Sequence, residues 1–428
     1  MKSYDVIIIG GGTSGCAAAY NCARLRLKTL LVEKNNFLGG LMSGGLVVPV
    51  MKSAVSDINC DYYKELVKTA KKFNAQITYS DGNDGWFNPE ILKIVIEDIL
   101  TKNGIKEYLD ILFETVVLDV EINDRLIKKI ILSNKTLSIP IDTIDYNTKF
   151  IDSSGSAAFS TLCGCRFIND TDNAQQGSLR FIIGNVDTDK FSDFIKSIDC
   201  NRDITNTYRN DRNTDNQIHF TTASTTDTYR IWALDELLQK GVEDNILIDS
   251  DRNYFQLFSV AGSASQAAFN CPEINTYKNN PYLASNELIN AKKAIWRLYS
   301  FCKKYFKGFE NSEIINIASQ TGLREERRVK TKYIYTKNDL LSGKTFKNPV
   351  LRANYSIDIH SDKKDGSILQ KTASYELPIE ALMSDDIDNL FVAGKILGAD
   401  FAAHSALRVQ KSCMQMGEAL AKYIYIQK

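Results

Sequence analysis

The arrangement of glycines near the start of the sequence is compatible with few folds. Residues 6–9 are a run of apolar, β-branched side chains, which is typical of a strand buried on both faces. Three glycines spaced GxGxxG follow this run at once, and a second apolar run ends at Glu33. The spacing predicts a strand, a tight turn, a helix and a second strand, which is the layout of a dinucleotide-binding unit.

Each of the three glycines has its own physical role in such a unit. Gly10 permits the tight turn after the first strand. Gly12 lets the backbone approach a pyrophosphate, because it has no Cβ in the way. Gly15 lets the following helix pack close to the strand. Together they predict a phosphate-binding turn.

The predicted helix, residues 13–26, and the acid after the second strand complete the unit. The N–H groups at the start of the helix, at Thr13 and Ser14, favour a bound anion, as does the helix dipole. Glu33 stands where a carboxylate accepts hydrogen bonds from ribose hydroxyls. By itself this stretch is compatible with NAD, NADP or FAD, and a glycine turn without a ligand is the alternative.

Length and composition limit the class of protein. The chain has 428 residues, which favours two domains. Its 52 basic residues balance 52 acidic ones, so we expect neither a nucleic acid nor an anionic membrane as partner. The nine cysteines contain no CxxC pair, so we predict no metal site, and we expect reduced thiols in the cytoplasm. No leader segment separates Met1 from the first strand, which agrees with that location.

Apolar spacing and cap residues predict elements along the rest of the chain. Asn88-Pro89-Glu90 opens a helix, with a cap residue, a first-turn proline and an acid at the positive end. Trp86 and Phe87, just before it, are predicted to pack in the core. Further helices are expected at 62–73, 284–305 and 405–425, and strands at 29–32, 116–122, 126–132, 148–152 and 389–392.

Glycines also end two strands far from the N-terminus, at Gly155 and Gly394. A nicotinamide dehydrogenase instead keeps its nucleotide-binding unit in one continuous block. The three strand-ending glycines, with Gly39 and Gly40 after the second strand, resemble the FAD-binding domain of the glutathione-reductase-like superfamily. The resemblance implies that the first strand contacts the pyrophosphate and the last returns beside the flavin.

Further motifs resemble the FAD-dependent oxidoreductase family within that superfamily. They lie at 87–93, 322–328, 340–343, 357–360 and 394–417. The resemblance implies an α/β fold with a Rossmann-like FAD-binding domain, formed by residues 1–160 and 376–428. This domain has three layers in the order ββα, that is, two sheets and one layer of helices. The resemblance also implies an inserted α+β substrate or cap domain over residues 161–375. Where flavoproteins often carry an acid after the last strand glycine, this chain has Lys395.

The same resemblance implies non-covalently bound FAD and a set of residues that hold it. We expect the final helix to begin near Ser405 and to direct backbone N–H groups at the flavin edge that becomes negative on reduction. The predicted cofactor-binding residues are Gly10, Gly12, Thr13, Ser14, Gly15, Glu33, Lys34, Gly39, Gly40, Val117, Ser154, Gly155, Gly394, Ser405, Ala406 and Leu407.

Two histidines are candidates for chemistry at the flavin. His404 precedes the predicted final helix, where it can act as an acid, a base or a hydrogen-bond donor, or simply cap the helix. His360 follows an alternating strand and can face the same cavity. The third histidine, His219, is interpreted as structural.

Two arginines complete the predicted catalytic set. On a helix, Arg324, Arg327 and Arg328 share one face, so an anion or nearby carboxylates must balance them. Arg324 is the candidate for contacting an anionic substrate group or the flavin edge. Arg408, one turn into the predicted final helix, is the second candidate.

The resulting functional prediction is an enzyme that transfers a hydride between a small organic substrate and FAD. A flavin monooxygenase is one alternative, although we find no second GxGxxG unit for NAD(P)H. A flavin-bearing binding or tRNA-modification subunit is the other. The electron donor or acceptor and the direction of reaction stay open, as does assembly into a homo-oligomer.

Overall fold

A parallel sheet of five strands organises the structure, which is a computed structural model. The strand order is β22-β9-β1-β2-β5, and every neighbouring pair is parallel. The strands are β1 (Val6–Ile9), β2 (Thr29–Val32), β5 (Leu109–Leu112), β9 (Lys149–Asp152) and β22 (Leu390–Val392). The structure describes residues 1–428 except 1–2, 52, 54, 57, 79–81, 135–136, 143–146, 170–174, 199–204, 210–217, 224–231, 278–279 and 362–367.

Each face of this sheet is covered by a different layer. Ile7 and Ile9 pack with residues of a three-stranded antiparallel sheet, β6 (Thr115–Asn123), β7 (Leu126–Asn134) and β8 (Leu137–Asp142). On the opposite face, Val6 and Ile8 pack with the helix layer. Alternate side chains of a strand point to opposite faces, so one buried strand serves both layers. The predicted three-layer ββα arrangement is confirmed.

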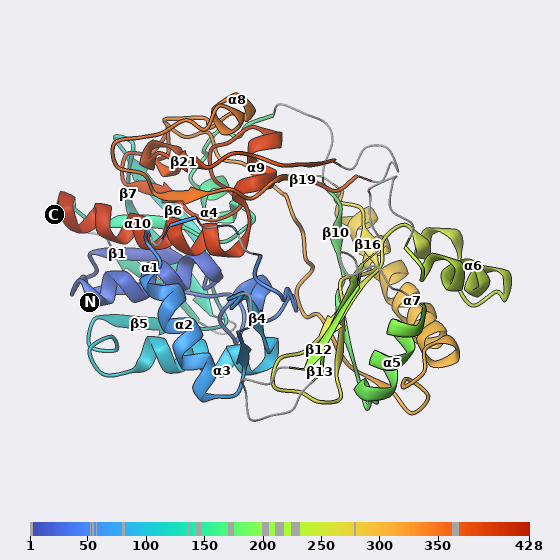
Figure 1. The fold of residues 1–428 in the computed structure, drawn as a ribbon. Coiled ribbons are helices and arrows are strands. Elements are labelled where there is room, and N and C mark those ends of the chain that lie inside the picture. The colour runs from blue at the N-terminus through green and yellow to red at the C-terminus, as the bar shows by residue number, and fades with distance from the viewer. Residues whose placement is uncertain are drawn as a thin grey trace.

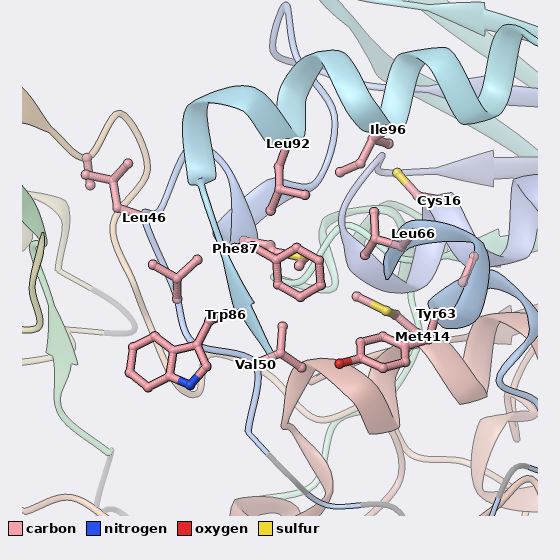
Figure 2. Packing of buried hydrophobic residues seen from close by; sticks show 14 of the residues in the cluster. Cys16, Leu46, Val50, Tyr63, Leu66, Trp86, Phe87, Leu92, Ile96 and Met414 are labelled. Atoms are coloured by element: carbon pink, nitrogen blue, oxygen red, sulfur yellow. The ribbon is translucent and has the colours of Figure 1, made fainter. Parts of the chain in front are cut away.

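Four helices make up the helical layer. They are α1 (Thr13–Arg24), α2 (Asp61–Lys72), α3 (Pro89–Thr101) and α10 (Gln410–Gln427). The side chain of Asn88 accepts hydrogen bonds from Glu90 N and Ile91 N, so the predicted cap of α3 is confirmed. Figure 2 shows Phe87 between α3, which carries Leu92, and α10, which carries Met414. Trp86 and Phe87 are buried, as predicted.

The first and last helices of this layer, α1 and α10, lie side by side (Figure 1). Gly417 makes their close approach possible, because a Cβ there would lie 2.1 Å from Ser14 O and 2.9 Å from Ala18 N.

Gly417→Ala is therefore expected to destabilise the protein by about 1–3 kcal/mol, although alanine is the better helix former by about 1 kcal/mol. The measurement is the free energy of unfolding from a urea titration of FAD-saturated protein. A gain in stability would mean that the two backbones do not meet closely at this position.

A six-stranded antiparallel sheet forms the second part of the molecule, on the side away from both termini (Figure 1). Its strands, in sheet order, are β12 (Asn206–Arg209), β13 (Ile218–Ala223), β14 (Gln256–Ser259), β15 (Ala267–Phe269), β11 (Phe181–Gly184) and β17 (Glu313–Ile317). Three helices accompany it: α5 (Thr188–Ile198), α6 (Asp235–Glu243) and α7 (Pro281–Tyr305). Stacked and edge-on phenylalanine rings fill the space between them, including Phe191, Phe269 and Phe306.

Shorter helices and strands complete the described structure. They include α4 (Ala158–Leu162), α8 (Lys337–Leu341), α9 (Phe401–Leu407), β3 (Gln76–Ile77), β4 (Trp86–Phe87), β10 (Gly177–Ser178), β16 (Glu273–Ile274), β18 (Leu351–Ala353), β19 (Ile357–Ile359), β20 (Ile368–Gln370) and β21 (Tyr375–Leu377). Although α8 and β18 fall in the predicted second domain, they contact α9 and α10 respectively. The domain limits 1–160 with 376–428, and 161–375, stay a prediction.

Candidate functional site

A cavity of about 950 Å³ runs from the parallel sheet to the antiparallel sheet. It opens at the carboxyl ends of β1, β9 and β22, where Gly10, Ser154 and Gly394 line it. From β1 the chain continues to β2 on one side, while β9 pairs on the other side. Such a switch point is where open parallel sheets bind ligands, and the volume suits a large one.

Glu33 lies at one end of the cavity and is held in place there. Its Oε2 accepts a hydrogen bond of 2.7 Å from Gly11 N. Its Oε1 accepts from the backbone and side-chain nitrogens of Asn35, at 2.8 Å and 2.6 Å. A carboxylate has about four lone-pair sites, so one remains for a ribose hydroxyl. Lys34 and Val117 line the same end.

The glycines of the turn have two different roles, because some allow close backbone packing and one leaves space for a ligand. A Cβ on Gly10 would lie 2.6 Å from Ser153 O, and one on Gly15 would lie 1.9 Å from Gly10 O. Both glycines therefore allow close contact of backbone with backbone. A Cβ on Gly12 would meet nothing nearer than Ser153 O at 3.9 Å, and Gly12 lines the cavity. Gly12 thus keeps space open for a ligand at the start of α1, which is a fit to a pyrophosphate.

The start of the last helix differs from the prediction. Ser405, Ala406 and Leu407 are fully buried near the end of α9, and none lines the cavity. The expectation that the final helix begins near Ser405 is wrong, and the predicted cofactor-binding role of these three residues remains a prediction. The reason is a break after α9, where Arg408 and Val409 leave the helix and Val409 becomes the extended N-cap of α10.

The helix N-terminus that faces the cavity belongs to α10 and not to residues 405–407. Val409 and Gln410, at the start of α10, line the cavity. The first N–H groups of a helix have no partner within it, and the dipole makes this end positive. Negative charge in the cavity is therefore favoured beside Gln410. The apolar stripe of this helix begins at Val409, and that signal in the sequence marks its true start.

His404 does not lie where the catalytic prediction needs it. Its ring is fully buried, its Nε2 lies 2.7 Å from Lys395 O, and it is not part of the cavity wall. Burial, with the charges of Arg328 and Arg408, holds the pKa of His404 well below its usual value. The structure therefore places His404 in the packed interior of α9 rather than at the cavity, and its predicted catalytic role remains a prediction.

His360 does line the cavity and lies between two carboxylates. Its Nδ1 is 3.1 Å from Glu273 Oε1, and its Nε2 is 3.3 Å from Asp358 Oδ1. Burial alone would raise the pKa of Asp358, but the hydrogen bond with His360 and the charge of Arg408 outweigh burial and hold this pKa well below its usual range. Asp358 is therefore ionised, and His360 has a fixed negative neighbour.

The three arginines at 324, 327 and 328 do not share a helix face, because residues 322–328 are not helical. Arg324 lines the cavity, and its Nη1 donates to Gln176 O and lies 3.8 Å from Glu273 Oε1. Arg327 lies over the ring of Phe167. Arg328 is buried and pairs with the fully buried Glu325 at 3.1 Å. Of the three, only Arg324 belongs to the site.

Arg328→Met is expected to destabilise the protein by about 3–5 kcal/mol, because it leaves the charge of Glu325 buried without its guanidinium. The more exposed Arg327→Met should cost about 1 kcal/mol or less. Urea titrations of both FAD-saturated variants measure this difference. Equal losses would show that the Glu325–Arg328 pair is not the one that matters for stability.

Arg408 and Arg180 line the cavity from different segments of the chain. Arg408 follows α9, and its Nη2 lies 3.1 Å from Asp358 O and 3.6 Å from Asp358 Oδ2. Arg180 precedes β11, and its Nη1 donates to Val48 O at 3.1 Å. Sequence reasoning missed Arg180, together with Asp358 and Glu273. The alternation of residues 355–359 was the available signal for Asp358, but none marked Arg180.

Most of the predicted residues do meet at this cavity. Lys395 also lines it, and its Nζ pairs with Glu326 at 2.9 Å and donates to Leu323 O. Gly15 and Gly39 are not part of the wall. The predicted residues that line the cavity are Gly10, Gly12, Thr13, Ser14, Glu33, Lys34, Gly40, Val117, Ser154, Gly155, Arg324, His360, Gly394 and Arg408.

Within the described residues, no group of three or more histidine, cysteine, aspartate and glutamate side chains could hold a metal ion. No helix within the described ranges has the length and hydropathy of a membrane span.

The sequence matches the model of the FAD dependent oxidoreductase family over residues 5–427. The chain belongs to this family. Its cofactor is FAD, and the enzyme is an FAD-dependent oxidoreductase. Glu33 fits the adenosine ribose, Gly12 and the start of α1 fit the pyrophosphate, and the cavity from Gly394 to Gln410 would hold the flavin.

Curated relatives match only short parts of this oxidoreductase. It is 34% identical to thioredoxin reductase of Bacillus subtilis over 110 residues, which cover 25% of this chain and 31% of the relative. It is 28% identical to glycerol 3-phosphate oxidase of Mycoplasma genitalium over 127 residues, 26% of this chain and 30% of the relative. The matches thus span less than a third of either relative.

A similar solved structure supports the fold. The structure of GidA from Aquifex aeolicus has a TM-score of 0.52 and 13% sequence identity, and it covers 99% of this chain and 63% of the other. At this identity the similarity shows the fold alone. It agrees with the Rossmann-type architecture found here.

Proposed function

We propose that this oxidoreductase oxidises a small organic substrate, with His360 as the residue that accepts the substrate proton. The observation that supports the proposal is the position of His360 in the cavity wall between Asp358 and Glu273. Oxidation of a carbon that carries a hydroxyl or amino group removes a hydride and a proton. Bound FAD supplies the acceptor for the hydride.

The protein supplies the acceptor for the proton. A neutral imidazole has one N–H, so it can donate to only one of the two carboxylates beside it. When His360 takes up a proton, both of its nitrogens donate, one to Glu273 and the other to Asp358. The charged form is then hydrogen-bonded on both sides.

The direct experiment is anaerobic reduction of the purified holoenzyme. A panel of alcohols, amines, hydroxy acids and amino acids is mixed with the protein, and loss of the visible flavin absorbance is followed. We expect at least one class to bleach the flavin without NAD(P)H. Bleaching by NAD(P)H alone, with incorporation of labelled oxygen into an added substrate, would instead identify a monooxygenase.

Location and partners are also proposals. Eight of the cysteines are buried free thiols, which supports a cytoplasmic location. The balanced charge supports a small-molecule substrate rather than nucleic acid or a membrane surface. Reoxidation requires a separate electron acceptor, and oxygen and artificial acceptors are the first to compare.

A further inference from the structure

We propose that the substrate carries a carboxylate, and that Arg180, Arg324 and Arg408 bind it in the cavity. This inference rests on the proposed function, because it names the substrate class of the same site. Each of the three arginines lines the cavity. They come from three separate segments, so the fold brings together charges that the sequence keeps far apart.

Arg180 gives the strongest indication. The residue is only 9% exposed, and its Nε has no hydrogen-bond partner among the described residues. Its contacts in that part of the chain are Nη1 with the carbonyls of Leu46 and Val48, and none is with a carboxylate. Burial, with the charge of Arg324, lowers the pKa of Arg180 to about 9. A buried guanidinium in this position is stabilised by an anion that enters the cavity.

Arg408 and Arg324 each have one carboxylate nearby, and each of these carboxylates also contacts His360. Asp358 lies 3.6 Å from Arg408 and 3.3 Å from His360. Glu273 lies 3.8 Å from Arg324 and 3.1 Å from His360. Two carboxylates therefore face three guanidiniums, which leaves one positive charge to be balanced. A monoanion such as a carboxylate balances this charge, whereas a phosphate dianion overcompensates it.

The position of the arginines separates this site from the phosphates of FAD. The pyrophosphate cradle is formed by Gly12 and the start of α1 on the parallel sheet. Arg180 instead precedes β11 of the antiparallel sheet, whose wall also carries Tyr254 and Gln256. Burial raises the pKa of Tyr254 to about 12, so its hydroxyl is a neutral hydrogen-bonding group. Among the described residues, this wall offers hydrogen-bond donors to an anion and adds no carboxylate.

The carboxylate of the bound substrate would also position the substrate carbon that is oxidised. Glu273 Oε1 contacts both His360 and Arg324, so an anion at Arg324 brings its neighbouring carbon toward His360. For a 2-hydroxy acid, the C–H bond breaks as a hydride to FAD and the O–H proton passes to His360. The C=O bond of the 2-oxo acid forms, so electrons and protons balance.

The test uses redox-inert probes, so that it does not depend on turnover. Acetate, propionate, acetamide and inorganic phosphate are titrated into the holoenzyme, and binding is followed by calorimetry and by the flavin spectrum. We expect the two carboxylates to bind and acetamide not to. Arg180→Met should weaken carboxylate binding at least tenfold, Arg180→Lys less, and Arg327→Met should leave it unchanged.

FAD content and melting temperature show whether each variant is folded, and Arg180→Lys keeps the test usable if Arg180→Met is not. Equal binding of acetate and acetamide would overturn the inference, as would phosphate binding more tightly than acetate. Carboxylate binding that depends on Arg180, without flavin bleaching by any carboxylic acid, would sustain this inference and refute the proposed oxidation. Bleaching by a neutral substrate, without carboxylate binding, would refute this inference and sustain the proposed oxidation.

Discussion

Gly12→Val is expected to abolish FAD retention in a protein that still folds. The side chain would enter the cavity rather than the protein, because a Cβ at this position meets nothing nearer than 3.9 Å. Gly12 has φ −74°, which any residue can adopt. The added methyl groups occupy the space at the start of α1 where the pyrophosphate belongs. We expect at least a hundredfold weaker binding, about 2.7 kcal/mol or more.

The matched control is Gly15→Ala, which should act through folding. A Cβ there would lie 1.9 Å from Gly10 O, so the backbone of β1 and α1 must separate. Circular dichroism of the apoproteins and fluorescence titration with FAD distinguish the two effects. Gly12→Val should have a near-native spectrum and no saturable binding, whereas Gly15→Ala should lose thermal stability. Native FAD affinity in Gly12→Val would refute the placement of the pyrophosphate.

The FAD-binding half was readable from the sequence because its determinants are local. The turn of Gly10, Gly12 and Gly15 lies within six residues, and Glu33 follows at a spacing set by one helix and one strand. The contacts of Glu33 with Gly11 agree with this expectation. Local geometry of this kind depends little on the rest of the chain, so the sequence pattern is sufficient to predict it.

The part of the site where the substrate would react, around His360 and Arg180, could not be predicted from a local sequence pattern. His360 is oriented by Glu273, which lies 87 positions earlier in the sequence. Arg180 directly precedes β11, so its position depends on how the antiparallel sheet assembles from strands spread over residues 181–317. The spacing of Arg324, Arg327 and Arg328 would put them on one face of a helix, but residues 322–328 are not helical, and Arg328 is buried against Glu325. Contacts between distant segments decide this part of the site.

The break between α9 and α10 shows why one boundary matters for function. An uninterrupted helix would have placed His404 and Ser405 at its start and Arg408 one turn further along. Because the helix stops at Leu407, His404 is buried in α9, whereas Arg408 reaches the cavity. The choice between the two histidines therefore depends on this boundary, and it can be tested directly.

His360→Gln is expected to slow flavin reduction by the substrate by about 10²–10⁴-fold. Glutamine can hydrogen-bond to one of the neighbours Asp358 and Glu273, but it cannot take up a proton. The rate of bleaching in anaerobic stopped flow measures the effect.

His404→Gln is the matched comparison, because it changes a histidine that the structure places outside the cavity wall. It should lower the melting temperature, since the buried ring and its contact with Lys395 O are lost. Once loaded with FAD, it should reduce at close to the wild-type rate. A large rate loss in His404→Gln, with a normal rate in His360→Gln, would return the proton-accepting role to His404. The opposite result assigns that role to the residue held between the two carboxylates.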